Sequence, residues 1–363
     1  MLSASPSGLR WDLFCRVVDN FGDIGVCWRL AADLASRGHR VRLWVDDATA
    51  LAWLAPQGLP GIEVIHWSSD CPILEPGDVV VEAFGCDPPE AFVRAMASRT
   101  APSRPPVWIN LEYLSAEDYV ERSHRLPSPQ FNGPGAGLTK WFFYPGFTSA
   151  TGGLLREPGL LARQARFDAK AWLAGLGVER RPGERLVSLF CYAAAPVASW
   201  LERLGDIPTL LLATPGHAAR LTKAAQAQGV PGTCRIRALP WLSQPDYDHL
   251  LWACDLNVVR GEDSFVRAQW AGRPFVWNIY PQDDGAHIVK LDAFLDRYLA
   301  AAAVPLAGPV RAWMHAWNAA DPVLPASLPD LARWQGHSVA WRDTLLGQTD
   351  LCTQLLEFVT EKR

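Results

Sequence analysis

The segment Leu251–Trp277, LWACDLNVVRGEDSFVRAQWAGRPFVW, decides the fold of the second half of the chain. The apolar run 256–259 predicts a buried strand, the polar run 260–264 predicts a tight turn, and a short helix follows. Gly272 is a typical residue for ending that helix, and 274–277 predicts a second strand. This order favours two parallel strands, so the turn lies at a carboxyl edge, where open α/β sheets bind ligands.

The turn carries groups of two chemical kinds. Arg260 supplies a fixed positive charge, and the helix that begins near Ser264 presents unpaired backbone N–H groups, a combination that suits a diphosphate. Glu262 and Asp263 do not suit an anion, but carboxylates accept hydrogen bonds from sugar hydroxyls. The pattern therefore indicates a nucleotide-sugar site, with N-capping of the helix as the competing role for Asp263.

The alternation of apolar strands and helices occurs twice along the chain. Strands are predicted at 13–18, 41–45, 62–66, 79–82 and 107–111, and again at 186–191, 209–213, 235–239, 256–259 and 274–277. This repetition predicts an α/β protein with two Rossmann-like domains that face each other across a cleft. We place the domains at residues 1–178 and 179–363, next to the polar, turn-rich segment GVERRPGER, and leave open whether the C-terminal helix packs back on the first domain.

One segment interrupts this alternation. Residues 126–153, LPSPQFNGPGAGLTKWFFYPGFTSATGG, are rich in Pro, Gly and Ser, which predicts a long connecting loop. Ordered aromatic loops of this length are usually functional.

Composition excludes several classes of protein. The 363 residues carry a net charge of −4 without a Lys/Arg run, which argues against nucleic-acid binding. The eight cysteines show no C-x-x-C pair and no zinc spacing, as expected for thiols in a reducing compartment. The N-terminus has no signal-peptide pattern, and no apolar run approaches the roughly 18 residues of a spanning helix. We therefore expect a cytoplasmic protein without a membrane partner.

Two aspartates follow the first predicted strand. Asp19 and Asp23 flank Gly22 in VVDNFGDIGVCW, and both belong to the ligand-binding edge of the sheet. The glycines do not match the G-x-G-x-x-G spacing of a dinucleotide site, so a cationic or hydroxyl-bearing acceptor is the better expectation. The competing roles are structural: an Asx turn for Asp19 and an N-cap for Asp23.

Further polar and aromatic side chains follow other strands. Asn110 and Glu112 are candidates on the acceptor side, although Glu112 is about as well explained as the start of a helix. In the second half, aromatic and amide side chains suit a nucleotide base and the groups around it, with simple packing as the alternative; these are Phe190, Tyr192, Gln244, Tyr247 and Tyr280. The pair Asp283–Asp284 is a poor ligand set for a metal ion, so no metal is expected.

The chain resembles the protein-arginine rhamnosyltransferases that modify bacterial elongation factor P, the EarP family. The matching segments extend over almost the whole chain: VVDNFGDIGVCWRLA, WINLEYLSAEDYVE, WFFYPGFTSATGGLL, RGEDSFVRAQWAGRPFVW and IYPQDDGAH. The resemblance implies a GT-B fold with an acceptor-binding first domain and a nucleotide-sugar-binding second domain. It implies TDP-β-L-rhamnose as donor, elongation factor P as acceptor, an α-linked product formed by inversion, and no metal or cofactor.

By the same resemblance, Asp19 and Asp23 match the acidic pair needed for catalysis. Donor-site positions are matched by Arg260, Glu262, Asp263, Ser264 and Tyr280, and the nucleotide pocket by Phe190, Tyr192, Gln244 and Tyr247. We favour Asp19 as the base and Asp23 as the group that holds the acceptor guanidinium, and the reverse assignment remains open. A nucleotide-sugar epimerase and a non-catalytic nucleotide-binding scaffold are the alternative functions.

Overall fold

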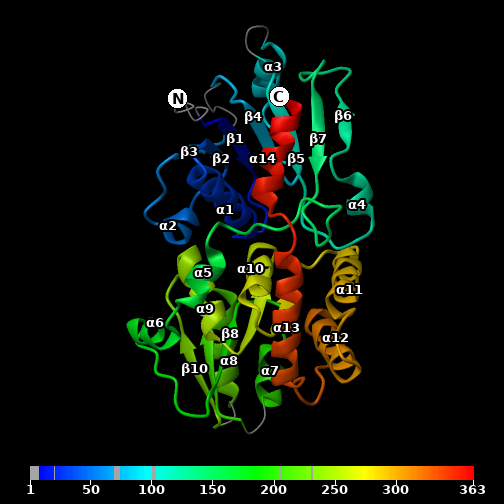
Figure 1. Cartoon of the computed structure of the whole chain (residues 1–363). Coiled ribbons are helices and arrows are strands. Elements are labelled where there is room, and N and C mark those ends of the chain that lie inside the picture. Colours follow the sequence, from blue (N-terminus) through cyan, green and yellow to red (C-terminus); the bar gives the residue numbers. More distant parts are fainter. Residues whose placement is uncertain (1–7, 20, 69–73, 100–103, 205–206, 230–231) are drawn as a thin grey trace. The chain divides into compact units, whose positions relative to one another are not determined.

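The computed structural model describes residues 8–19, 21–68, 74–99, 104–204, 207–229 and 232–363. The chain forms two compact units: the first comprises Met1–Pro158 and Gln348–Arg363, and the second comprises Gly159–Gly347. Each unit has its own sheet and its own buried core (Figure 1). The predicted repetition of one α/β pattern along the chain is confirmed.

The first unit contains a seven-stranded sheet in the order β3-β2-β1-β4-β5-β7-β6, in which only the β6–β7 pair is antiparallel. Its strands are β1 Arg10–Cys15, β2 Arg40–Val45, β3 Ile62–His66, β4 Val79–Ala83, β5 Val107–Leu111, β6 Pro127–Pro129 and β7 Thr139–Phe143. Its helices are α1 Gly22–Ser36, α2 Leu51–Leu54, α3 Glu90–Ala97, α4 Tyr119–Ser123 and α14 Leu351–Lys362.

The two faces of this sheet bury different side chains. Trp11, Leu13 and Cys15 of β1 pack with apolar residues of α1 and of α14, drawn in red in Figure 1. Phe14, one position out of phase, packs in a second cluster with Phe92 of α3. Because successive side chains of a strand point to opposite faces, this alternation explains why helices cover both sides.

The second unit contains a five-stranded parallel sheet in the order β10-β9-β8-β11-β12. Its strands are β8 Arg185–Leu189, β9 Thr209–Ala213, β10 Cys234–Ala238, β11 Leu256–Arg260 and β12 Phe275–Asn278. Its helices are α5 Leu160–Ala165, α6 Ala169–Gly175, α7 Val197–Arg203, α8 His217–Gln228, α9 Gln244–Ala253, α10 Asp263–Ala271, α11 Ala286–Leu299, α12 Val304–Asn318 and α13 Leu331–Leu346.

The boundary between the units corrects the expected one after Val178. The structure divides the chain at Pro158, because α5 and α6 pack on the second unit. Gln164 Nε2 donates to the Ala271 carbonyl at 2.9 Å, and Trp172 Nε1 donates to Asp246 at 3.1 Å. The segment GVERRPGER therefore lies inside the second unit. At the other end, α14 belongs to the first unit, whereas α13 stays in the second.

Two local predictions were also wrong. The first strand ends at Cys15 rather than Val18, because the N–H groups of Val17 and Val18 donate to the carboxylates of Asp46 and Asp23 instead of a neighbouring strand. The segment 126–153, expected to be a loop, contains strands β6 and β7. The Pro and Gly residues led to the loop prediction, but the segment forms an antiparallel hairpin at the edge of the sheet, where proline is tolerated.

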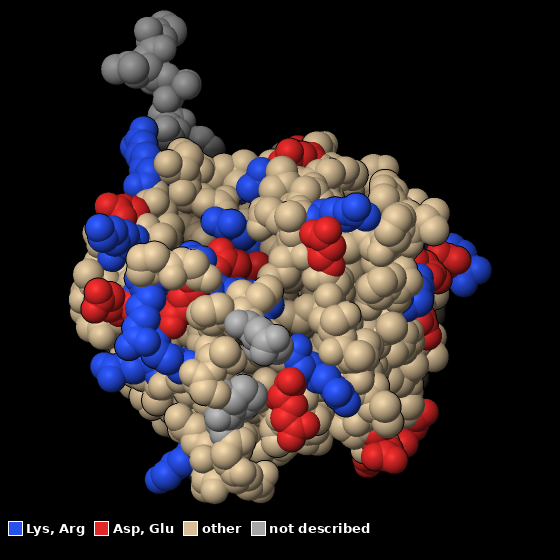
Figure 2. Space-filling view, turned by 90° about the horizontal axis from the view of Figure 1, so that it is seen from below, with Lys and Arg blue, Asp and Glu red and all other residues tan. Residues whose placement is uncertain are grey.

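On the face shown in Figure 2, Lys and Arg side chains are interspersed with Asp and Glu rather than gathered into one basic field. Within the ranges that the structure describes, no helix has both the length and the apolar composition needed to cross a membrane.

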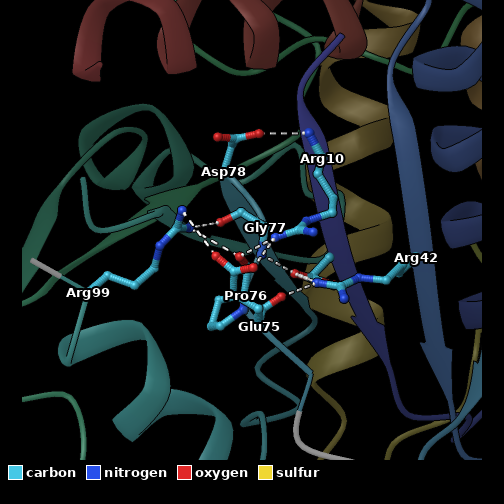
Figure 3. A network of polar contacts seen from close by, with 8 residues as sticks. Arg10, Arg42, Glu75, Pro76, Gly77, Asp78 and Arg99 are labelled. Carbon is cyan, nitrogen blue, oxygen red and sulfur yellow. Dashed lines mark hydrogen bonds and ion pairs between the residues drawn. The ribbon is translucent and has the colours of Figure 1, made fainter. Parts of the chain in front are cut away.

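A polar network fixes the amino-terminal edge of the first sheet (Figure 3). The guanidinium groups of Arg10, Arg42 and Arg99 converge on the turn 75–78, where they donate to the carbonyls of residues 76, 75 and 77 at 3.0, 2.8 and 2.6 Å. This turn precedes β4, so it lies at the edge opposite the loops that follow the strands. The network therefore stabilises the sheet without facing those loops.

Asp12 lies at the centre of this network. It is 0% exposed, and its two carboxylate oxygens accept from Arg42 at 2.6 and 2.7 Å, from Trp44 Nε1 at 2.9 Å and from Gly77 N–H at 2.6 Å. A buried carboxylate is tolerated only when it is paired and hydrogen-bonded in this way.

We expect Asp12→Ala to lower the free energy of unfolding by about 3–5 kcal/mol, because it leaves the buried Arg42 guanidinium without its carboxylate partner. Urea denaturation followed by circular dichroism measures this change. Arg94→Ala is the matched control, since it breaks an exposed ion pair with Glu90 on α3, and such pairs contribute little. Equal effects of the two substitutions would contradict the expectation.

Candidate active site

The loop between β1 and α1 brings the two predicted acidic residues together. Asp23 lies in the first turn of α1 and is 3% exposed. Its Oδ2 accepts the backbone N–H groups of Val18 at 2.8 Å and Asp19 at 2.9 Å, so the carboxylate holds the preceding loop in place. A Cβ added at Gly22 would lie 2.8 Å from Asp19 Oδ2, so a larger residue here would require the Asp19 carboxylate to move.

The structural roles proposed for these residues are partly present. Phe21, not Asp23, is the N-cap residue of α1, and it makes no side-chain capping bond. The Gly22 N–H donates to the Asp19 carbonyl at 2.7 Å, so Asp19 takes part in a turn through its backbone. These backbone roles leave a functional role for the two carboxylates open.

The environment of Asp23 combines opposing effects on its pKa. Burial raises the pKa, and the hydrogen bonds from Asp19 and Val18 oppose that rise. The negative charge of Asp19 raises it further, and a bond from the Tyr113 hydroxyl lowers it. The net direction is upward from the ordinary value for an aspartate, and a higher pKa makes a carboxylate a better proton acceptor.

The end of β5 and the residue after the strand carry the two residues predicted for the acceptor side. Asn110 Nδ2 donates to Glu112 Oε1 at 2.8 Å, and Asn110 Oδ1 accepts the N–H of Gly85 at 3.1 Å. Burial raises the pKa of Glu112. Glu112 does not begin a helix, because α4 starts at Tyr119. Asn110 thus connects the loops that follow β4 and β5.

The sequence places Tyr113 at the same carboxyl end as Asn110 and Glu112, but it predicted no role for this residue. Its hydroxyl donates to Asp23 Oδ1 at 3.3 Å, and its ring stacks on Phe84. The signal for Tyr113 was its place just after a strand. Phe84 gave no signal, because its role depends on a backbone conformation that is visible only in the structure.

In the second unit, Arg260 lies at the end of β11 and is 5% exposed. Its guanidinium lies over the rings of Phe190, at 4.5 Å, and Tyr192, at 4.6 Å. Its Nη1 donates to the Cys191 carbonyl at 3.3 Å. The two rings, which follow β8, therefore fix the orientation of the cation by cation–π contacts.

The start of α10 lies beside this arginine. Glu262 is the N-cap residue without a side-chain capping bond, and Asp263 begins the helix. N-capping by Asp263 is therefore not what the structure shows. The Ser264 hydroxyl donates to the Arg260 carbonyl and accepts the Arg260 N–H at 3.1 Å, so it braces the turn. The N-terminus of α10 and the guanidinium of Arg260 both favour the binding of an anion.

The other predicted donor-site residues join this cluster. Gln244 is buried and contacts Asp263 at 3.5 Å through its amide nitrogen. The ring of Tyr247 packs edge-on against Phe190, and Tyr280, 44% exposed, packs edge-on against Tyr192. A residue that the sequence did not single out supports them, since Asn278 Oδ1 accepts the Tyr192 N–H at 2.8 Å.

Within the described ranges, no three His, Cys, Asp or Glu side chains are placed to hold a metal ion. Asp284 has a local role, because its Oδ1 accepts the N–H of Ala286 at the start of α11 at 3.0 Å. Positive charge that could bind an anion is supplied in this unit by Arg260 and by the start of α10.

Comparison with known proteins shows the family of the chain. The model of the family "Elongation-Factor P (EF-P) rhamnosyltransferase EarP" matches residues 11–360. The protein-arginine rhamnosyltransferase of Pseudomonas aeruginosa is 46% identical over 97% of this chain and 99% of its own length. That of Shewanella oneidensis is 35% identical over 99% of each chain.

Solved structures give the fold. One from work on EarP-mediated arginine glycosylation of translation elongation factor EF-P aligns with a TM-score of 0.65 at 32% identity, covering 98% of this chain and 100% of that one. The glycosyltransferase SnogD of Streptomyces nogalater aligns with a TM-score of 0.50 at 15% identity, over 97% of this chain and 99% of its own, which supports the fold alone. The predicted α/β, GT-B class is confirmed. Since the family model matches residues 11–360 and the relatives are similar over almost their whole length, the chain belongs to the EarP family of elongation factor P rhamnosyltransferases, and it is a glycosyltransferase.

Proposed function

We propose that this protein transfers rhamnose from TDP-β-L-rhamnose to an arginine side chain of elongation factor P, with inversion to an α-linked product. The observation that carries the proposal is the loop of Asp19 and Asp23, which presents two carboxylates at the ligand-binding edge of a sheet in a chain of this family. Since a translation factor works in the cytoplasm, we place the reaction there.

The donor is assigned to the second unit. Arg260 and the start of α10 would stabilise the negative charge that develops on the departing TDP. Phe190, Tyr192, Gln244 and Tyr247 supply aromatic and amide groups for the nucleotide, and Glu262, Asp263 and Tyr280 supply acceptors and a hydroxyl for the sugar or nucleotide. No metal is required in this scheme, because the arginine and the helix provide the positive charge.

The acceptor chemistry needs carboxylates. Arginine is a poor nucleophile, because its pKa exceeds about 12 and its lone pairs are delocalised. A carboxylate can hold the guanidinium by charge-assisted hydrogen bonds, and another can accept the proton as the new C–N bond forms. Asn110 and Glu112 are assigned to the acceptor side of the same edge.

We assign Asp19 as the base and Asp23 as the group that holds the guanidinium. Asp23 accepts from Val18, Asp19 and Tyr113, so its orientation is fixed. A carboxylate held in one orientation suits the task of positioning the guanidinium, which leaves proton transfer to Asp19.

Incubating the protein with TDP-β-L-rhamnose and elongation factor P, then weighing the acceptor by mass spectrometry, tests the function. A gain of one deoxyhexose on an arginine peptide is expected. An epimerase would change the nucleotide sugar without an acceptor, and a scaffold would leave both molecules unchanged, so either result would overturn the proposal.

We expect Asp19→Asn and Asp23→Asn each to lower kcat by roughly 10²–10⁴-fold, since each removes a carboxylate that acts on the guanidinium. Affinity for TDP, measured by calorimetry, should stay at the wild-type value. Asp47→Asn is the control, because this exposed carboxylate follows β2 and makes local hydrogen bonds with Thr49. Near-normal turnover in either active-site variant would remove that residue from the mechanism.

We expect Arg260→Ala to weaken TDP binding about 10-fold to 100-fold, the range for lost hydrogen bonds to a charged group. Isothermal titration calorimetry with TDP measures the change. Arg311→Ala serves as control, because Arg311 pairs with Asp292 and Asp296 on the surface of the same unit. An unchanged affinity in Arg260→Ala would show that the diphosphate binds elsewhere.

We expect turnover to persist in excess EDTA, because the charge on the leaving group is met by protein groups. Initial rates with and without chelator, and after addition of Mg²⁺, give the measurement. Loss of activity in EDTA that Mg²⁺ restores would instead assign a metal-binding role to Asp283 or Asp284.

A further inference from the structure

The turn after β4 holds an unusual backbone conformation. Phe84 has φ 59°, in the left-handed region that bulky residues rarely adopt. Three hydrogen bonds fix it there: its N–H donates to the Leu111 carbonyl at 2.7 Å, Gly85 N–H donates to Asn110 at 3.1 Å, and Cys86 N–H donates to the Ala83 carbonyl at 3.3 Å. Strained backbone of this kind concentrates at functional sites.

The conformation has one clear structural result. The ring of Phe84 stacks on the ring of Tyr113, with centroids 4.2 Å apart and planes 10° from parallel. The Tyr113 hydroxyl donates to Asp23 Oδ1 at 3.3 Å. One face of the tyrosine ring is therefore supported by Phe84 and its tip is tied to the acidic loop, while the side chain keeps 39% of its surface exposed.

We propose that the stacked pair Phe84–Tyr113, the aromatic platform, is a binding site for the planar guanidinium of the acceptor arginine. This inference rests on the proposed function and deepens it. A guanidinium stacks on an aromatic face and donates hydrogen bonds in its own plane. A guanidinium lying on Tyr113 can point its N–H groups at a carboxylate that contacts the same ring, Asp23.

The charge around the platform suits a cation. Asp19, Asp23 and Glu112 come from the two loops next to it, and burial raises the pKa of Asp23 and Glu112. A partly desolvated carboxylate is stabilised when a cation binds beside it. The compact ammonium of lysine cannot stack in this way, so the platform would distinguish arginine from lysine.

Two substitutions at Tyr113 separate the ring from the hydroxyl. Tyr113→Phe keeps the platform and removes the bond to Asp23, so kcat should fall while the KM for elongation factor P stays near the wild-type value. Tyr113→Leu removes the ring, and the acceptor KM should rise by roughly 3-fold to 30-fold, the range that cation–π contacts correspond to. The donor KM should change in neither variant.

A matched control and a second variant keep the test independent of folding. Tyr119→Leu removes a tyrosine of similar exposure, 41%, that packs against Tyr144, and it should leave the acceptor KM unchanged. Phe84→Leu removes the support beneath Tyr113 and should raise the acceptor KM in the same direction. Thermal unfolding of each variant shows whether the fold is retained.

Elongation factor P with lysine in place of its target arginine supplies the last comparison. The wild-type enzyme should bind the arginine form more tightly than the lysine form, and Tyr113→Leu should lose most of that preference. If the wild-type enzyme transfers sugar but Tyr113→Leu and Phe84→Leu keep its acceptor KM, the platform is overturned and the proposed function stands. If the wild-type enzyme transfers nothing to the arginine, the proposed function itself fails.

Discussion

Parallel strand pairing is the constraint on which the rest of the structure depends. β1 pairs in parallel with β2 and β4 in the first unit, and β11 pairs in parallel with β8 and β12 in the second. Parallel strands send all their following loops to one edge of the sheet. This brings residues far apart in sequence, such as Asp23 and Tyr113, to the same edge, where they make a hydrogen bond.

The carboxyl edges of the two sheets carry side chains of opposite charge. The first gathers carboxylates that are held by backbone N–H groups, as Asp23 is by Val18 and Asp19. The second gathers a guanidinium held between aromatic rings and a helix start that favours anions. In both, a buried charge is oriented by its neighbours, as the proposed catalytic roles require.

Much of the fold, and the position of Arg260 at a carboxyl edge, could be predicted. Apolar runs of strand length, such as 256–259, are recognisable because a strand buried on both faces has almost no polar side chain. Arg260 could be found because a charge directly after such a strand must lie at its carboxyl edge. The boundary at Pro158 could not, because the polar segment near Val178 resembles a linker, and only packing shows that α6 belongs to the second unit.

The sequence by itself determined the alternation of strands and helices and the residues at each carboxyl edge, because both are local properties of pattern that need no knowledge of neighbours in space. The family followed instead from the resemblance of whole segments, such as RGEDSFVRAQWAGRPFVW, and the family model agrees with it. Only the tertiary structure decided that Asn110 holds the turn at Gly85, and that the left-handed backbone of Phe84 places its ring beneath Tyr113. Such contacts depend on how strands that are distant in sequence align with each other. No local pattern in the amino-acid sequence specifies that alignment.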